Sequence, residues 1–265
     1  MVKGEIKSTR RGFVKGVAAG TAAVAVAGAL TAGSASTKES LETRLEALEK
    51  RLQQVEDVQA IQRLQYGYNY YVEHMMKQEV IDCFSDSPDV LLDWLEGKWK
   101  GKAGVRKYFD VNQVPPVGFR HQLIPSAGLI TLAPEGKTAK GRWYAFGGIM
   151  TPMPAKEGEP PSFSRRFIDG IYEMGYVKED GVWKIKVLDY HPQWHADFET
   201  GWAHTRPAYV AFYTEADLYP GNPVGPDALM DPKPVLWPET EVVPFHYPHP
   251  VRGHKQERPK AKTAA

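Results

Sequence analysis

The sequence predicts an α+β fold in which a long helix comes first and a sheet of long antiparallel strands follows. Three observations support this prediction: a leucine seam near the N-terminus, two hairpin signals in mid-chain, and a globular composition. The 265 residues are 42% hydrophobic and 25% charged, which suits a folded protein with one sizeable core. The net charge of +1 creates no field that attracts nucleic acid, so we expect no nucleic-acid partner.

Residues 1–36 have the pattern of an export signal. A consecutive arginine pair, Arg10 and Arg11, is followed after one glycine by Phe13, and this resembles the twin-arginine motif. Residues 16–37 carry no charge and are rich in Ala, Gly, Val and Thr, as in the apolar region of a signal peptide. We therefore expect export to the periplasm by the twin-arginine route and no stable membrane insertion after cleavage. An uncleaved membrane anchor is the alternative.

Residues 37–55 are predicted to form an N-terminal amphipathic helix. Apolar residues recur there at alternating spacings of four and three, and charged residues occupy the other faces. The seam consists of Leu41, Leu45, Leu48, Leu52 and Val55. Such a face needs a partner surface, so we expect a homo-oligomer, either a dimer or a trimer. The helical pattern continues to Phe84, with a bend or break predicted at Gly67.

Strand and turn signals follow the helix. Asp89–Leu95 is predicted to be a short strand and Gly104–Phe109 a short helix. Two turns, Pro134-Glu135-Gly136 and Glu179-Asp180-Gly181, predict two hairpins. Their four strands are His121–Leu132, Thr138–Met150, Phe167–Val177 and Val182–Tyr190. The Pro/Gly-rich segment Thr151–Pro161 between the hairpins is predicted to be a surface loop.

Residues 199–265 form a C-terminal extension in which prolines are frequent and regular periodicity fades. The extension carries more aromatic side chains than a disordered segment usually does. We therefore expect an ordered, extended tail that packs on the domain or on a neighbouring subunit as far as about Gly253. A disordered basic end is predicted from about residue 255.

The order and local sequence of these elements resemble the SnoaL-like families of the nuclear transport factor 2-like superfamily, with residues 56–198 as the domain. Leu64–Phe84 resembles the family's first core helix, in which a Tyr is followed five residues later by a carboxylate, here Tyr68 and Glu73. His121 lies where scytalone dehydratase and bile-acid dehydratases carry a histidine. The resemblance implies a cone-shaped, curved antiparallel sheet packed with helices around a pocket.

The resemblance also implies a cofactor-independent lyase with His121, Glu73 and Tyr68 as catalytic residues. An imidazole is a base near neutral pH, a carboxylate orients it, and a phenol stabilises developing oxyanion charge. The expected substrate is a hydrophobic, hydroxylated aromatic or polycyclic small molecule. Loss of water and loss of formaldehyde, as in the similar lignin-dimer deformylating lyases, are both open. The alternative is a non-catalytic module of the same fold that binds an apolar ligand.

Four further residues are expected to bind the substrate. Tyr71, Trp143 and Tyr144 supply aromatic surface, and Arg166 is suited to a carboxylate or a phenolate. The chain departs from the family at two points. Glu73 replaces the usual Asp, and Trp143 and Tyr144 stand on the strand where scytalone dehydratase has its second catalytic His.

No cofactor and no metal are expected. The sequence has no glycine-rich phosphate loop, and its one cysteine, Cys83, excludes an intrachain disulfide and favours a buried thiol. His191 and His195 have a spacing that suits metal ligands on a helix, but Pro192 between them argues against a helix there. A metal site assembled across subunits is the weaker alternative, and it would draw on the tail residues His246, His249 and His254.

Overall fold

One long helix and four long strands dominate the part of the chain that the structure describes. The computed structural model describes residues 30–94, 97–111, 117–153, 162–201, 213–234, 236 and 241–256. The chain divides into two units, Met1–Glu49 and Lys50–Ala265. The twin-arginine motif and most of the expected export signal lie outside the described residues, as does most of the basic C-terminal end.

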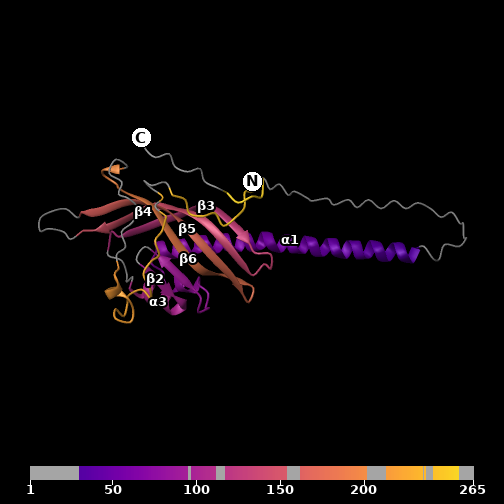
Figure 1. Ribbon diagram of the computed structural model, residues 1–265, viewed down its shortest axis with the longest axis horizontal. Coiled ribbons are helices and arrows are strands. Elements are labelled where there is room, and N and C mark those ends of the chain that lie inside the picture. Colours follow the sequence, from indigo (N-terminus) through magenta and orange to yellow (C-terminus); the bar gives the residue numbers. More distant parts are fainter. Residues whose placement is uncertain are drawn as a thin grey trace, which may run out of the picture. The chain divides into compact units, whose positions relative to one another are not determined.

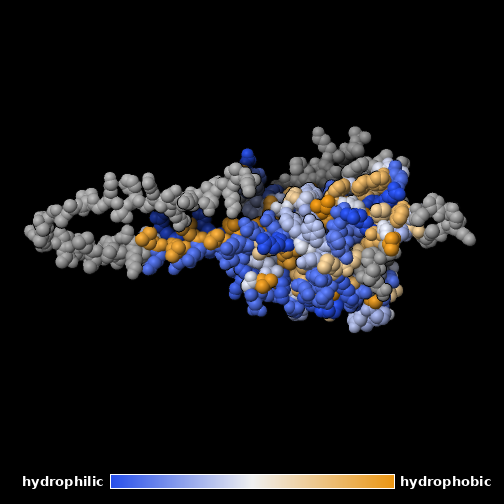
Figure 2. All heavy atoms as spheres, turned by 180° about the vertical axis from the view of Figure 1, so that it is seen from behind, coloured by the Kyte–Doolittle hydropathy of each residue, from blue (hydrophilic) through white to orange (hydrophobic). Residues whose placement is uncertain are grey.

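Helix α1 spans Leu30–Glu73, and its residues up to Glu49 are the described part of the first unit. It begins earlier than the predicted residue 37. The apolar seam predicted along it is solvent-exposed, with Leu41, Leu45 and Leu48 each between 56% and 60% accessible. Figure 2 shows this seam as an orange stripe along the helix. None of the described helices is long and apolar enough to cross a membrane.

A tight turn ends helix α1. The break predicted at Gly67 is wrong, because α1 continues through this residue. A Cβ atom placed at Gly67 would lie 3.6 Å from the ring of Tyr71, an ordinary contact distance. The chain leaves the helix after Glu73 and turns at Met75, whose φ of 54° is rare for a residue with a side chain. Helix α2, Lys77–Asp82, follows.

The sheet has six strands in the order β2-β1-β6-β5-β4-β3. Figure 1 shows the long strands side by side, with α3, Gly101–Val111, next to β2. The strands are β1 Leu91–Trp94, β2 Gly97–Lys100, β3 Arg120–Leu132, β4 Thr138–Pro152, β5 Phe163–Glu179 and β6 Val182–Asp197. The predicted fold class and the two predicted hairpins are confirmed. Two features differ: β2 had not been predicted, and β1 pairs with β6 in parallel.

Alternating burial and turn chemistry explain the long hairpins. Buried and accessible residues alternate along β4 from Thr138 to Gly147, so one face of this strand packs on the core. The β5–β6 turn uses Asp180 and Gly181 at φ values of 49° and 82°. Positive φ at both central residues is the pattern of a type I′ hairpin turn, which Asp-Gly favours. The local sequence therefore specifies this hairpin.

Two irregularities interrupt the pairing of β5 with β6. In one of them, Asp169 lies opposite Trp194 while the next residue, Gly170, lies opposite Pro192, so Gln193 has no partner in the register. The other lies between Gly175 and Tyr176. Bulges of this kind increase local twist and bend a sheet. They contribute to the curvature of the sheet.

A buried hydrogen-bond chain ties α1 to the sheet. Trp143 Nε1 donates to the Tyr176 hydroxyl at 3.0 Å, which donates to Gln65 Oε1 at 2.7 Å. Gln65 Nε2 donates to Asn69 Oδ1 at 2.9 Å, and Asn69 Nδ2 donates to the Leu123 carbonyl at 3.1 Å. Since each of these polar groups is buried, each bond avoids the desolvation cost of an unpaired partner.

A second anchor of α1 is the buried carboxylate of Asp57. Its Oδ1 accepts hydrogen bonds from Lys178 Nζ at 2.7 Å, Trp183 Nε1 at 2.9 Å and Gln53 Nε2 at 3.1 Å. Burial on its own would raise the pKa of Asp57, but the bonds from Lys178, Trp183 and Gln53 outweigh it and lower the pKa. The charged form is therefore the stabilising one.

We expect Asp57→Asn to destabilise the protein at pH 7. Because the folded-state pKa of Asp57 is lowered, its stabilising contribution is present above the unfolded pKa and is lost as pH falls through the folded pKa. The difference in free energy of unfolding between wild type and variant should therefore shrink at acidic pH. Urea unfolding at pH 7 and at about pH 2.5, below the ordinary pKa of 3.8, measures it, and a difference that grows on acidification would contradict the assignment.

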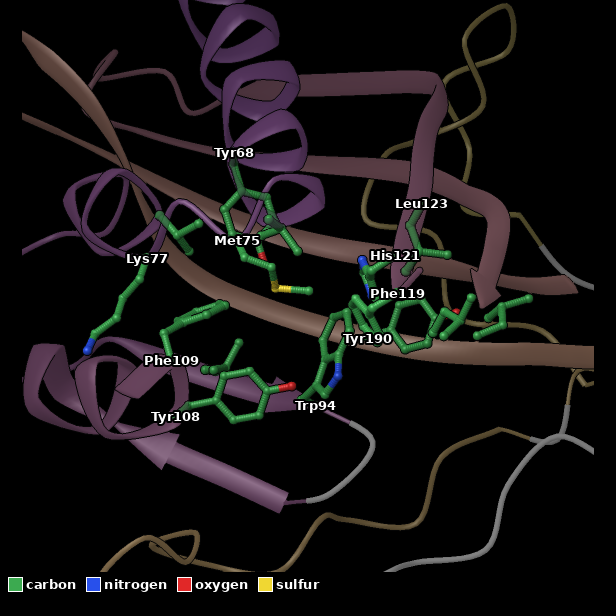
Figure 3. A pocket seen from close by; sticks show the side chains of 15 residues that line it. Tyr68, Met75, Lys77, Trp94, Tyr108, Phe109, Phe119, His121, Leu123 and Tyr190 are labelled. Atoms are coloured by element: carbon green, nitrogen blue, oxygen red, sulfur yellow. The ribbon is translucent and has the colours of Figure 1, made fainter. Parts of the chain in front are cut away.

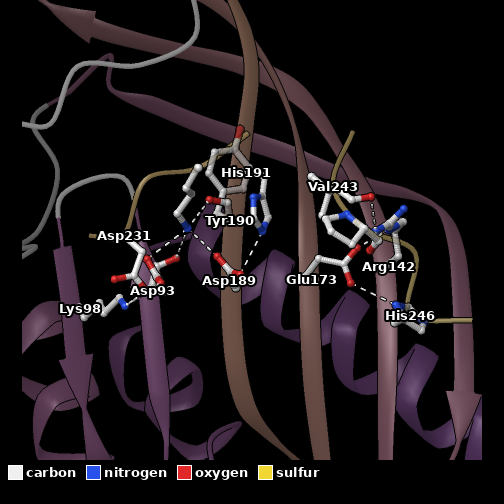
Figure 4. Close-up of polar contacts among 12 residues, drawn as sticks. Asp93, Lys98, Arg142, Glu173, Asp189, Tyr190, His191, Asp231, Val243 and His246 are labelled. Carbon is white, nitrogen blue, oxygen red and sulfur yellow. Dashed lines mark hydrogen bonds and ion pairs between the residues drawn. The ribbon is translucent and has the colours of Figure 1, made fainter. Parts of the chain in front are cut away.

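Described parts of the C-terminal tail, within residues 213–234 and 241–256, contact the sheet, as predicted for an extended tail that packs on the domain. Lys98 N donates to the Ala228 carbonyl at 2.8 Å, so the tail pairs with β2. Further along, Arg142 on β4 donates to the carbonyls of Val243 at 3.1 Å and Pro244 at 2.5 Å. Figure 4 shows this cluster, in which Arg142 also contacts Glu173.

A second cluster holds the tail through Lys233, whose partners Asp93, Asp189 and Tyr190 are labelled in Figure 4. The ammonium of Lys233 contacts Asp93 Oδ1 at 3.1 Å and Asp189 Oδ1 at 2.5 Å, and donates to the Tyr190 carbonyl at 2.8 Å. His191 Nε2 lies 2.9 Å from Asp189 Oδ2. Lys233 is only 7% accessible, so this tail residue neutralises two carboxylates of the sheet in a nearly dry environment.

Candidate active site

A partly open, mainly apolar cavity of about 240 Å³ lies between the helices and the sheet of the second unit. Figure 3 shows that its side chains come from several elements: Tyr68 from α1, Tyr108 and Phe109 from α3, His121 and Leu123 from β3, and Tyr190 from β6. The remaining walls are largely hydrophobic, including Val72, Leu92, Phe119, Ile149 and Ile168. A cavity of this size and lining suits a small apolar molecule.

Aromatic rings form the floor of the cavity. Trp94 from β1 lies with its ring centroid 4.8 Å from that of Tyr190 and 5.8 Å from that of Tyr172. Tyr68 packs edge-on against Phe84 at 5.8 Å. Such rings hold a flat ligand by packing, and their edges and faces favour another aromatic ring. The cavity therefore fits an aromatic or polycyclic ligand.

His121 is the titratable base in this wall. It lies near the start of β3 opposite Ile149 of β4, and its Nδ1 is buried with no hydrogen-bond partner. Burial lowers the pKa of the imidazole below its usual value, against an opposing hydrogen bond to its own backbone. The ring is therefore neutral at pH 7 and able to accept a proton.

Two phenols of the cavity are potential proton donors. Burial raises the pKa of Tyr68 well above its usual value, and nearby Tyr172, Tyr108 and Cys83 add to the effect. The pKa of Tyr190 is also raised well above its usual value, first by burial, and its buried hydroxyl has no hydrogen-bond partner. Both phenols stay protonated at neutral pH, so each can donate a hydrogen bond to a ligand oxygen.

The structure brings Tyr68 and His121 to one cavity but places Glu73 outside it. Glu73 forms an ion pair with Arg120 Nη2 at 3.1 Å and lines a separate hollow with Tyr66 and Asn69. The reason is helical geometry: α1 stays regular through Glu73, so a residue five positions after Tyr68 faces about 140° away from it. No carboxylate is among the described residues that line the cavity.

Three of the four expected substrate-binding residues also lie elsewhere. Trp143 is fully buried in the core, where it bonds to Tyr176, and Tyr144 lies on the other face of β4 and is exposed. Tyr71 lines a groove beside the β5–β6 turn. Strand alternation separates Trp143 from Tyr144, because neighbours point to opposite faces. Arg166 lines a hollow that adjoins the cavity.

Tyr190 and Trp94 are among the lining residues that the sequence did not predict. Tyr190 lies in a predicted strand but is one of 13 tyrosines, and nothing in its neighbourhood marks it. Trp94 follows the buried residue Asp93 in a four-residue strand. Only the pairing of β1 with β6 brings the two rings together, and such a long-range contact leaves no local signal.

Asp169 on β5 is a further titratable group near the site. Its neighbours in register are Phe146 and Trp194, and burial raises its pKa to about 6 against a hydrogen bond from the Gly170 backbone. Its charge is one cause of the raised pKa of Tyr190. The carboxyl is therefore ionised at pH 7 only at a cost in stability.

We expect Asp169→Asn to raise the melting temperature at pH 7.5 and to change it little at pH 4. A raised folded-state pKa means that stability is lost as pH rises from the unfolded pKa of 3.8 through about 6, and the neutral amide avoids this loss. Thermal unfolding at both pH values measures it. Asp180→Asn, in the exposed turn, is the matched control. An equal pH-independent shift in both variants would contradict the prediction.

The histidines and the cysteine occupy separate environments. His246 Nδ1 lies 3.0 Å from Glu173 Oε2, and the rings of His249 and His254 stack at 5.1 Å. Among the described residues no group of three or more His, Cys, Asp or Glu side chains is placed to hold a metal ion. Cys83 is a buried thiol, as predicted, and burial raises its pKa to about 11.

These features define a class of protein, an α+β domain in which a curved sheet and helices surround an apolar cavity. The SnoaL-like domain family matches residues 53–189, which is more than half of the chain. The chain therefore belongs to the SnoaL-like domain family, as the sequence resemblance predicted. No curated protein sequence matches the chain at a significant level.

Several solved structures are similar in fold. A protein provisionally assigned as a scytalone dehydratase from Novosphingobium aromaticivorans DSM 12444 is 19% identical, with a TM-score of 0.45 over 62% of this chain and 98% of that one. Hexachlorocyclohexane dehydrochlorinase LinA-type3 from Novosphingobium barchaimii LL02 is 18% identical, with a TM-score of 0.44 over 56% and 94%. A Mycobacterium tuberculosis protein of unknown function is 18% identical, with a TM-score of 0.40 over 51% and 76%.

Proposed function

We propose that this protein is an exported, periplasmic lyase that needs no cofactor and acts by acid–base catalysis on a hydrophobic, hydroxylated aromatic or polycyclic molecule. One observation carries the proposal: the imidazole of His121, whose buried Nδ1 bonds to no other residue, faces an apolar cavity together with the phenols of Tyr68 and Tyr190. An unpartnered buried nitrogen is costly in a folded protein, so its retention points to a role toward a ligand.

The chemistry requires only these groups. His121 accepts a proton from a carbon next to an electron-withdrawing group, the electron pair of the C–H bond forms a C=C bond, and the C–O bond breaks. A phenol donor hydrogen-bonds to the departing oxygen, which leaves as water after taking up the proton. For loss of formaldehyde, His121 instead takes the hydroxymethyl O–H proton. The O–H electron pair forms the C=O bond of formaldehyde, the C–C bond breaks and its electron pair forms the C=C bond. A second hydroxyl then leaves as water with the proton that His121 took up.

The proposal divides the roles within the site differently from the sequence prediction. Glu73 is paired with Arg120 outside the cavity, so it does not orient the imidazole. The proposal therefore assigns the base to His121 and the donors to Tyr68 and Tyr190. Acid–base catalysis of this kind contributes about 10²- to 10⁴-fold to the rate. The rest of the acceleration comes from holding the ligand against the aromatic floor.

The test is a panel of aromatic diols and polycyclic hydroxy ketones, followed by detection of new unsaturation and of released formaldehyde. We expect kcat/KM to fall on the acidic side, with an apparent pKa below 6.5, because His121 must be neutral and burial lowers its pKa. The phenols, with pKa values raised well above 10, contribute no alkaline limb below pH 10. An acidic limb above pH 7 would contradict the role of His121.

The second candidate function is a non-catalytic module that binds an apolar ligand in the same cavity. It is favoured by one observation, the lack of a carboxylate among the described residues that line the cavity, which leaves His121 without an ionised partner. Tight binding of panel compounds without any turnover would support this alternative and overturn the lyase.

A further inference from the structure

A second hollow, of about 270 Å³, continues the cavity along β4 and β5. Ile149 and Ile168 line both spaces, so the hollow and the cavity lie next to each other. The cavity side of this pair is aromatic, whereas the hollow adds the polar side chains of Ser164, Arg166 and His195. One elongated site therefore has an apolar body and a polar end.

Arg166 provides a cation at the polar end. It is solvent-accessible, and among the residues that the structure describes it forms no ion pair. Its neighbour Arg165, by contrast, lies 3.6 Å from Glu199. Asp197 is opposite Arg166 in the β5–β6 register, yet no ion pair joins the two. The guanidinium is free to form two parallel hydrogen bonds with an incoming carboxylate.

His195 provides a second group toward the same space. Its Nε2 is buried and has no hydrogen-bond partner. Arg166 is close enough for its charge to lower the pKa of His195, together with the larger effect of burial. A neutral imidazole next to a guanidinium can donate an N–H to an anion, and this would satisfy the buried nitrogen.

We propose that the hollow is a carboxylate subsite and that the substrate is therefore an aromatic or polycyclic hydroxy acid. The inference rests on the proposed function for the cavity and deepens it by naming the substrate class. A carboxylate fits better than a phenolate because carboxylic acids are ionised at pH 7, whereas a phenol with a pKa near 10 is neutral. The carboxylate would contact Arg166 and His195 while the ring system fills the cavity.

Isothermal titration calorimetry of matched pairs tests the subsite on the full chain. The probes are biphenyl-4-carboxylate with biphenyl-4-carboxamide, and naphthalene-2-carboxylate with its amide. We expect the acid to bind about 10- to 100-fold more tightly than the amide, since hydrogen bonds to charged groups are the strong ones. Arg166→Gln should remove this preference and leave amide binding unchanged, and Asp197→Asn should increase it.

Arg165→Gln is the matched control, because it removes an adjacent arginine that faces Glu199. Equal affinity for acid and amide, no binding of any probe, or an equal effect of Arg165→Gln and Arg166→Gln would overturn the subsite. The experiments also distinguish failure of the proposed lyase function from failure of the carboxylate subsite. If the acid preference depends on Arg166 but no compound of the panel is converted, the subsite stands and the protein is a binding module for aromatic acids.

Discussion

Replacing His121 with glutamine is expected to lower kcat/KM by about 10²- to 10⁴-fold on any compound that the protein converts. Glutamine keeps a polar side chain of similar length but cannot accept a proton at neutral pH. Nδ1 of the imidazole is buried and bonds to no other residue, so its removal breaks no hydrogen bond to another part of the fold. Ligand affinity, measured by calorimetry with an inert analogue, should change much less than the rate.

Two further variants separate the role of His121 from a structural effect. Tyr68→Phe removes only a hydroxyl from a fully packed ring and should lower the rate while leaving the melting temperature within a few degrees. Glu73→Gln, outside the cavity, should leave kcat/KM within about threefold of wild type, which is close to 0.6 kcal/mol. If Glu73→Gln were as damaging as His121→Gln, the assignment of roles would have to be abandoned.

Lys233→Met should destabilise the protein by about 3–5 kcal/mol, the cost of leaving buried charges without a partner. Lys233 is 7% accessible and contacts both Asp93 and Asp189. Lys98 Nζ pairs with Asp93 only at 3.8 Å and also contacts Asp231, and His191 reaches only Asp189, so neither replaces the ammonium shared by the two carboxylates. Methionine keeps the volume of the side chain, so the loss reports on charge. Urea unfolding at pH 7 measures the free energy.

Lys186→Met is the control for this prediction. Its ammonium lies 3.7 Å from Asp89, and both side chains are accessible. Exposed pairs of this kind contribute roughly 0–1 kcal/mol. Equal losses in Lys186→Met and Lys233→Met would show that the tail is held by packing and that the buried charges matter little.

The fold was predictable where its signals are local. The β5–β6 hairpin follows from Asp180-Gly181 and from alternating apolar residues on either side. Strand β2 could not be predicted from the sequence, because Gly97–Lys100 begins with glycine and contains one apolar side chain, Trp99. Its partners are β1 and Ala228 of the tail, a long-range pairing that no local pattern reports. The turn at Met75 likewise lacks the glycine that its positive φ would favour.

The site was predictable in part. The family resemblance placed Tyr68 and His121, and both line the cavity. The same resemblance placed Glu73 with them, which a continuous α1 does not permit. Trp143 is an aromatic residue in the right strand, but a hydrogen bond to Tyr176, 33 positions away, fixes it in the core. The face that a side chain presents is decided by such distant partners.

Gln193, the residue of β6 without a partner in the register, has a consequence for how this site can diversify. Downstream of it the alternation of the strand changes parity, so His195 points into the hollow while Trp194 packs toward Phe146, 6.1 Å away between ring centroids. Insertion of one further residue after Gln193 would shift the following residues by one position and put the indole of Trp194 in place of the imidazole of His195. Specificity at this end of the sheet can therefore change through chain length alone, with every neighbouring residue type conserved.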